Sequence, residues 1–232
     1  MRLGLRLVSG LNAASAQRIV QARALLPFDS AEDLSRRAQL EQFEMKILAG
    51  ADALASLSGH RRQQVWDAAA LHAVPELLRE APVEEDYLEL PPAPEGEEIV
   101  FDYAALGLSL RRHPMALLRD KLAAMRFLSS AQLQDLPNGR LVRACGIVTL
   151  RQQPPTAKGV LFISLEDEHG AVQVIVWKSV REAQRSQVLN AKLLGVLGTW
   201  QREGDVRNLI ARRLVDLTPM LGRLAAPSRD FR

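Results

Sequence analysis

Residues 160–177 decide the fold, and they read Val-Leu-Phe-Ile-Ser-Leu-Glu-Asp-Glu-His-Gly-Ala-Val-Gln-Val-Ile-Val-Trp. Two apolar runs, 160–166 and 172–177, stand on either side of the turn sequence Asp167-Glu-His-Gly170. In the first run apolar residues alternate with Phe162 and Ser164, which is the period-two pattern of a strand with one buried and one open face. The stretch therefore predicts two strands joined by a hairpin turn.

Runs of the same kind continue on both sides of this hairpin. The other predicted elements are strands at 141–150, 192–201 and 206–217 and one helix at 180–190, with Arg202-Glu-Gly-Asp205 joining the last two strands. Five strands with a helix between the third and the fourth is the order of an OB-fold, a small and partly open barrel. We therefore predict a five-stranded OB-fold β-barrel over residues 139–218, followed by a tail over 219–232.

The amino-terminal part of the chain is predicted to be helical. Asn12 is a suitable N-cap for a first helix that Pro27 ends, and Ser30 begins a second helix with a capping-box spacing. The four helices expected in this part cover residues 13–26, 30–38, 40–49 and 60–73.

An acidic, proline-rich stretch separates the helical part from the barrel. Residues 75–100 carry one basic and nine acidic side chains, and prolines recur between 75 and 94. Because prolines interrupt regular elements and like charges repel one another, an extended linker is expected here. The predicted fold class is α+β with several domains: a helical domain (1–78), the linker (79–98), a connecting helical segment (99–138), the barrel and the tail.

Composition excludes several classes of protein. The chain has 232 residues, 47% of them hydrophobic, which suits one or two globular domains. Cys145 is the only cysteine, so a disulfide scaffold is excluded. No apolar run approaches the ~20 residues that span a bilayer, and a cytoplasmic protein without a membrane partner is expected. Residues 141–232 carry 14 basic and 8 acidic side chains, a weak indication of a polyanionic ligand.

Residues 8–14, Val-Ser-Gly-Leu-Asn-Ala-Ala, have the pattern of a helix-hairpin-helix turn. Gly10 allows close backbone approach, and the following helix presents free N–H groups that suit a phosphate. Arg6, Arg18 and Arg23 are near enough in the sequence to add positive charge. The alternative is a plain turn between two helices in which the glycine ends the first helix.

The predicted barrel offers a second candidate DNA site. OB-folds bind single strands on strands two and three and with the loops that join strands one to two and four to five. The candidate residues on these strands and loops are the cations Arg143, Arg151, Lys158, Lys178, Arg202 and Arg207 and the aromatic residues Phe162 and Trp177. Aromatic rings stack on any base and cations pair with any phosphate, although Trp177 and Trp200 are equally suited to the barrel core.

The sequence does not assemble an active site. His113 has no carboxylate partner nearby in the sequence, and Cys145 lies within a predicted strand, where it is expected to be buried and inert. Glu166, Asp167 and Glu168 are a conceivable metal site, but solvated turn residues are the favoured interpretation. We therefore predict no catalytic residue, no metal ligand and no cofactor in this chain.

Several stretches of the sequence point to one known family. These stretches are residues 2–30, 48–51, 62–66, 101–103 and 106–114, then Arg151-Gln-Gln-Pro-Pro-Thr-Ala-Lys-Gly159, then 162–168 and 228–232. Together they resemble the helix-hairpin-helix and OB regions of bacterial C-family DNA polymerases, and in particular the error-prone alpha subunit. The run over 151–159 is specific, and the resemblance covers nearly the whole chain.

The resemblance implies a DNA-binding carboxyl-terminal portion of an error-prone polymerase used in damage-induced mutagenesis and translesion synthesis. The palm with its catalytic aspartates would precede residue 1, so this chain alone is expected to be inactive, with Mg²⁺ required only by the full-length enzyme. Implied partners are single-stranded template, duplex backbone, the sliding clamp and mutagenesis accessory proteins. The rival hypothesis is an interaction scaffold whose barrel docks a replication or repair protein, and salt dependence separates the two.

Overall fold

The computed structural model describes residues 3–71, 88–157, 159–204, 206–224 and 229–230. The chain divides into two units, residues 1–111 and residues 112–232, and each is described by itself. The described part of the first unit contains the 3-10 helix η1 (Leu5–Leu7) and the helices α1 (Ala13–Leu25), α2 (Ala31–Arg37), α3 (Gln42–Gly50), α4 (Ala55–Ser58), α5 (Arg61–Ala70) and α6 (Glu95–Leu106).

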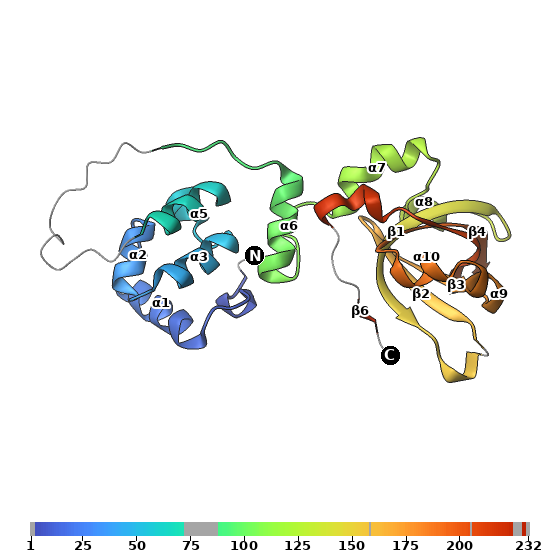
Figure 1. The fold of residues 1–232 in the computed structure, drawn as a ribbon, viewed down its shortest axis with the longest axis horizontal. Helices are drawn as coiled ribbons and strands as arrows, with labels where there is room; N and C mark the ends of the chain where they lie inside the picture. The colour runs from blue at the N-terminus through green and yellow to red at the C-terminus, as the bar shows by residue number, and fades with distance from the viewer. Residues whose placement is uncertain (1–2, 72–87, 158, 205, 225–228, 231–232) are drawn as a thin grey trace, which may run out of the picture. The chain divides into compact units, whose positions relative to one another are not determined.

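The first two helices of this unit begin at the predicted capping residues. Asn12 Oδ1 accepts a hydrogen bond of 2.9 Å from Ala14 N, and Ser30 Oγ accepts one of 3.0 Å from Asp33 N. Each bond satisfies a backbone donor that the first helical turn leaves free. The helices α1, α2, α3 and α5 gather around a common apolar core, in which Met45 is fully buried (Figure 1).

Helix α6 begins inside the predicted linker. Its first turn contains Glu95, Glu97 and Glu98, and negative side chains are favourable there because the amino-terminal end of the helix dipole is positive. The last four residues of the predicted linker are therefore helical, while residues 72–87 lie outside the described residues. The boundary between the two units falls after Arg111.

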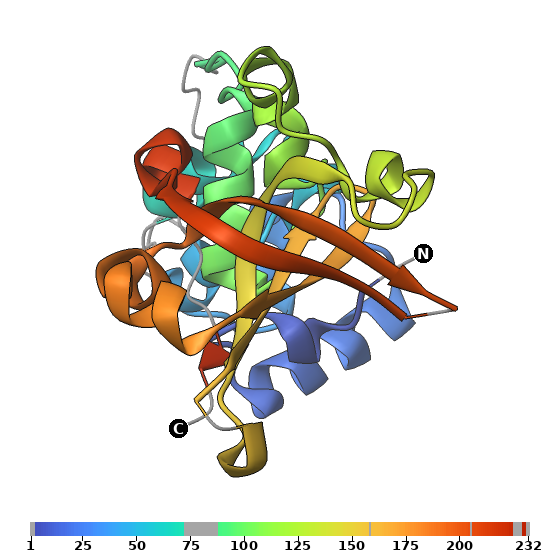
Figure 2. The same cartoon turned by 90° about the vertical axis from the view of Figure 1, so that its right-hand side faces the viewer.

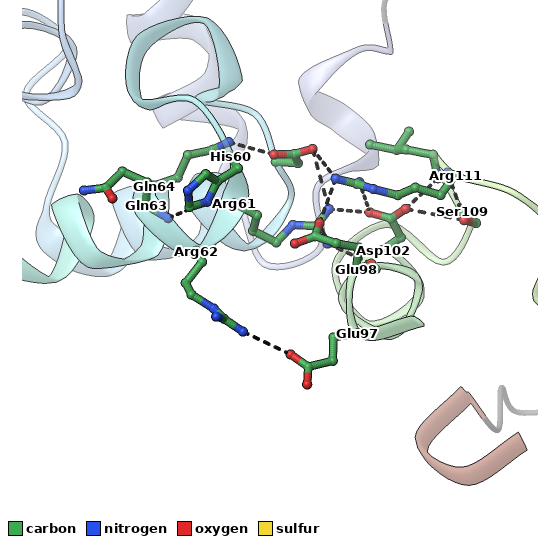
Figure 3. Close-up of polar contacts among 12 residues, drawn as sticks. His60, Arg61, Arg62, Gln63, Gln64, Glu97, Glu98, Asp102, Ser109 and Arg111 are labelled. Carbon is green, nitrogen blue, oxygen red and sulfur yellow. Dashed lines mark hydrogen bonds and ion pairs between the residues drawn. The ribbon is translucent and has the colours of Figure 1, made fainter. Parts of the chain in front are cut away.

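A buried group of charged side chains fixes α6 to the rest of the first unit (Figure 3). Asp102 is fully buried and accepts hydrogen bonds from Arg61 and, at 2.9 Å, from Arg111 Nη1. Arg61 Nη1 also donates to the backbone oxygen of Glu98 at 2.8 Å, and Arg111 Nη2 donates to Asp52 Oδ2 at 2.8 Å. Burying charged side chains is costly unless they are paired in this way, so the group ties Asp52 and α5 to α6 and to Arg111.

The second unit is built around a closed β-barrel, which confirms the predicted OB-fold. Its strands pair in the order β2-β3-β5-β4-β1, and β1 pairs again with β2. The β3–β5 pairing is parallel, and the long antiparallel hairpin of β4 and β5 is drawn in orange to red in Figure 2. The strands are β1 (Leu141–Gln152), β2 (Leu161–Asp167), β3 (Gly170–Val176), β4 (Leu193–Glu203) and β5 (Val206–Asp216), and β6 (Arg229–Asp230) pairs with β1.

Short helices surround the barrel, and the helix predicted at 180–190 is divided in two. The break falls at Gln184, whose backbone is not helical, with φ −124° and ψ 42°. The side chain of Gln184 instead bonds to the backbone of Leu214, donating to its oxygen at 2.9 Å and accepting from its nitrogen at 3.0 Å. The helices of this unit are α7 (Pro114–Ala124), α8 (Ser130–Gln134), η3 (Pro155–Ala157), α9 (Lys178–Ala183), α10 (Arg185–Asn190) and η4 (Thr218–Leu224).

The barrel core follows the predicted alternation. Leu161, Ile163 and Leu165 are buried, whereas Phe162 and Ser164 between them are half-buried. Leu161, Ile163 and Leu165 belong to one apolar core in the barrel interior, so Phe162 and Ser164 lie on the outer surface of the barrel. The strand prediction at this hairpin is therefore confirmed.

Two register shifts interrupt the alternation elsewhere. One lies in β1 between Val148 and Leu150, and the other lies between Leu197 and Gly198 where β4 pairs with β5. At the second shift the strands approach so closely that a Cβ on Gly198 would stand 2.1 Å from the backbone oxygen of Ile210. Such shifts decide which side chains reach the outer surface, because one extra residue reverses the facing of those that follow.

Candidate nucleic-acid interface

An apolar row crosses the outside of the barrel over β2, β3 and β5. Phe162 is paired with Ile175, and Ile175 is paired with Ile210, so the three side chains are neighbours on one face. All three are half-buried, at positions that alternate with the core residues. This apolar row offers one aromatic ring and two aliphatic side chains to a flat ligand such as a nucleobase.

A basic row lies beside the apolar row over β1, β4 and β5. Arg143 is paired with Leu197, and Leu197 is paired with Arg213. Both arginines are exposed. Leu197 stands two residues before Thr199, the partner of Ile210, so the basic row and the apolar row are adjacent on the same outer surface.

The sequence analysis did not single out Arg213. The neighbouring positions Arg212 and Arg213 are both exposed, although strict alternation would turn one of two consecutive strand residues inward. The register shift opposite Leu197 leaves Arg212 without a strand partner and turns Arg213 outward. The signal that could have found this surface was the pair of consecutive arginines within a predicted strand.

Arg151 is not placed on the surface where the sequence predicts a DNA contact. Its side chain is buried, with 8% of its surface exposed, and does not reach toward a ligand from the first loop. Arg151 Nε donates to the backbone oxygen of Val188 at 2.8 Å, and Nη2 donates to the backbone oxygen of Ala191. The guanidinium therefore joins β1 to the end of α10, which is a structural role.

The other predicted barrel residues lie in different surroundings. Trp177 is 52% exposed directly after β3, whereas Trp200 is 3% exposed and belongs to the core. Lys178 is exposed and stands 3.9 Å from one exposed carboxylate, a pairing of little strength in water. Arg202 is exposed in the β4–β5 hairpin, and Lys158 lies outside the described residues.

The predicted hairpin has the expected backbone conformation at its glycine. Gly10 has φ +83°, a left-handed conformation that favours glycine. Helix α1 begins three residues later and has no acidic residue in its first turn. However, the depression of about 590 Å³ beside Gly10 is lined by the carboxylates of Glu41 and Glu44 together with Arg18.

The three arginines near this hairpin in the sequence have different surroundings. Arg18 Nε donates to the backbone oxygen of Ala38 at 2.9 Å, and its Nη2 lies 3.3 Å from Glu44 Oε2. Arg18 is therefore engaged within the unit. Arg6 is exposed on η1, and Arg23 is exposed beside a different depression, of about 700 Å³.

The titratable groups singled out in the sequence are structural in their contacts. His113 caps α7 by accepting a hydrogen bond of 3.2 Å from Met115 N, and burial lowers its pKa. Burial raises the pKa of the Cys145 thiol to about 12, so this thiol stays protonated at neutral pH. Neither group is prepared for acid–base or nucleophilic chemistry.

Asp167 is not the solvated turn residue that the sequence analysis favoured. Its side chain is buried and accepts hydrogen bonds of 2.6 Å from both the backbone N and Oγ of Ser130. Burial alone would raise the pKa of Asp167. The pKa is nevertheless lowered, because the carboxylate accepts these bonds and another from His169 N and lies near Arg119. Within the described ranges no group of three or more His, Cys, Asp or Glu side chains is arranged to hold a metal ion.

Comparisons with known proteins agree with the two halves of this architecture. Residues 1–64 match the family described as helix-hairpin-helix motif, and residues 142–217 match the family described as OB-fold nucleic acid binding domain. The asparaginyl-tRNA synthetase from Pyrococcus horikoshii aligns with 44% of this chain and 24% of its own at a TM-score of 0.35 and 17% identity, a likeness too low to argue from.

The whole of this chain is similar to part of several curated error-prone DNA polymerases. The protein from Ralstonia nicotianae is 54% identical over an alignment that covers 100% of this chain and 22% of that protein. The proteins from Azoarcus sp. and Bordetella parapertussis are 51% and 50% identical over the same shares. The chain thus spans about a fifth of the length of these relatives.

The fold and these matches identify a helix-hairpin-helix motif and an OB-fold barrel in one chain. Along its entire length this chain is 54% identical to a stretch of the error-prone DNA polymerase from Ralstonia nicotianae. Across the described residues, no helix is both long and apolar enough to cross a membrane.

Proposed function

We propose that this chain is a DNA-binding portion of an error-prone DNA polymerase, and that its barrel holds single-stranded template. The observation that carries the proposal is the adjacency of the apolar row and the basic row on one outer surface of the barrel. Bases would contact Phe162 and its aliphatic neighbours, and phosphates would pair with Arg143 and Arg213. Exposed Trp177 and Arg202 would extend the contact at its ends.

The hairpin of the first unit would hold the duplex. Gly10 and the free N–H groups at the start of α1 suit a phosphate of the duplex backbone, with Arg6 as the accessible cation. The carboxylates of Glu41 and Glu44 line the depression beside Gly10, and their negative charge weakens the binding of a phosphate there. The duplex contact is therefore proposed to be the weaker of the two.

The activity of the whole protein is proposed from its relatives. In the complete polymerase, the catalytic centre and its Mg²⁺ would lie in the part of the protein that this chain does not contain, and DNA synthesis would serve damage-induced mutagenesis and translesion synthesis. The sliding clamp and mutagenesis accessory proteins are proposed partners, and the cytoplasm is the proposed location. We expect the chain alone with Mg²⁺ and nucleotides to extend no primer.

A salt titration tests the proposed barrel function. The full chain is titrated with a fluorescent single-stranded oligonucleotide at several salt concentrations. If Arg143 and Arg213 each contact one phosphate, log affinity should fall against log salt with a slope of about −1.4, at roughly −0.7 per contact. The double variant Arg143→Ala with Arg213→Ala should remove most of this slope. Arg185→Ala, which removes an exposed arginine on α10 outside both rows, is the matched control.

The outcome also decides between the two hypotheses. A slope near zero, or a double variant that behaves like the control, would contradict phosphate binding at the basic row. Apolar docking of a protein depends little on salt, so that result would favour the interaction scaffold instead.

A further inference from the structure

A row of polar side chains borders the apolar row on the side opposite to the basic row. Ser164 is paired with Gln173, Gln173 with Asn208, and Asn208 with Gln201, which places them in register across β2, β3, β5 and β4. Ser164, Gln173 and Asn208 each stand two residues along their strand from a residue of the apolar row, so these two rows are about 7 Å apart. We call these four residues the amide row.

The amide row has unused hydrogen-bonding capacity. Ser164 Oγ donates to Gln173 Oε1 at 3.1 Å, which leaves the two N–H donors of the Gln173 amide available. Within the part of the chain that the structure describes, no side-chain hydrogen bond joins Asn208 or Gln201 to another residue. All four side chains are exposed or half-buried. The row therefore presents amide N–H donors, together with the amide oxygens of Asn208 and Gln201, to a ligand.

The three rows stand in an order that matches the parts of a nucleotide. Along β5 the order is Arg213, Ile210 and Asn208, from basic to apolar to amide. A nucleotide has its phosphate at one end, a flat ring in the middle and hydrogen-bonding groups on the far edge of that ring. Phosphates over the basic row and rings over the apolar row would bring the base edges to the amide row.

We propose that the amide row hydrogen-bonds to the edges of unpaired bases, so that the barrel binds a base with hydrogen-bonding groups on that edge, such as thymine, more tightly than an isostere that lacks them. The inference rests on the proposed function, because it requires single-stranded DNA on this surface. It goes beyond that function, since stacking and phosphate pairing alone would make binding nearly independent of base identity. Amide groups recognise base edges with good discrimination when the geometry permits.

The experiment compares thymine with an isostere that cannot form hydrogen bonds. The full chain is titrated with oligo-dT of about 12 nucleotides, within the range for one OB-fold, and with the same strand carrying difluorotoluene in place of thymine. Ring shape and phosphates are unchanged between the two strands, so the ratio of affinities isolates the base edge. We expect oligo-dT to bind at least about fivefold more tightly, the lower end of the discrimination by a good amide contact.

Variants then locate the effect. Gln173→Leu and Asn208→Leu keep side-chain bulk on the strands but remove the amides, and should bring the ratio close to one without changing the salt slope. Gln187→Leu, on α10 outside the three rows, is the matched control and should leave the ratio unchanged. Circular dichroism checks that each variant is folded, and either of the two row variants suffices if the other does not fold.

The failures of the two proposals are distinguishable. If both strands bind the parent equally, or if both row variants keep the fivefold ratio, the amide row does not read the base edge while the proposed template binding stands. If neither strand binds the parent at any salt concentration, the proposed function fails and this inference fails with it.

Discussion

Arg151→Ala should destabilise the barrel without changing how DNA affinity depends on salt. The variant removes donors from the backbone oxygens of Val188 and Ala191, in a place where the arginine is 8% exposed. Leaving a buried acceptor unpaired costs about 1–3 kcal/mol, so leaving both carbonyl oxygens unpaired should lower the free energy of unfolding of the second unit by roughly 2–6 kcal/mol. Arg143→Ala, which removes an exposed arginine from the same strand, should lower it by less than about 0.5 kcal/mol.

Two measurements on the same proteins separate structure from binding. Urea unfolding is followed by tryptophan fluorescence in a Trp66→Phe background, so that Trp177 and Trp200 report on the barrel alone. The oligonucleotide titration at several salt concentrations is then repeated with each folded variant. Arg143→Ala should flatten the slope by about 0.7, whereas Arg151→Ala should leave it unchanged.

Arg151→Lys refines the comparison. Lysine keeps the positive charge but lacks the planar fork that reaches two carbonyl groups at once, so part of the stability should still be lost. Unchanged stability of Arg151→Ala together with a flattened salt slope would refute the reasoning, because it would mean that this side chain reaches a phosphate after all.

Three further predictions concern Phe162, Asp167 and Gly10. Phe162→Ala should weaken single-strand binding by about 1–3 kcal/mol with the salt slope unchanged, and the reverse pattern in the titration would contradict stacking. The lowered pKa of Asp167 stabilises the fold above its ordinary value of 3.8 and ceases to do so as the pH falls through the lower folded value. Acid unfolding of Asp167→Asn should therefore depend less on pH below about 4, and equal pH profiles for variant and parent would rule this out. Gly10→Val should strain the hairpin at φ +83° and weaken duplex binding, and it counts only if circular dichroism is unchanged. Undiminished duplex affinity in that folded variant would contradict the hairpin contact.

The strands β2 and β3 were predictable from the sequence because each has one buried face. Leu161, Ile163 and Leu165 must face the core together, so their spacing fixes both the strand and its orientation. The helix starts were predictable for a similar local reason, since Asn12 and Ser30 satisfy the N–H groups of the turn that follows them.

The facing of individual cations was not predictable. Arg143 and Arg151 are eight residues apart in β1 and would share a face in a regular strand. In the structure β1 pairs with β4 up to Ile147 and with β2 beyond it, and the register shifts between Val148 and Leu150. That shift turns Arg151 inward while Arg143 stays outside. The shift depends on partners distant in the sequence, and no local pattern reveals them.

The same reasoning limits what a count of charges says about binding. Residues 141–232 carry 14 basic side chains, yet Arg151 is buried among backbone oxygens, and its charge does not stand on the surface. Arg143 and Arg213 are the cations that stand beside the apolar row, on strands two positions apart in the sheet. Two phosphate contacts give a shallow salt dependence, so most of the affinity on the proposed surface must come from base stacking and base edges. We therefore expect the proposed surface to bind unpaired template in preference to an intact duplex, because paired bases expose neither their faces nor their pairing edges.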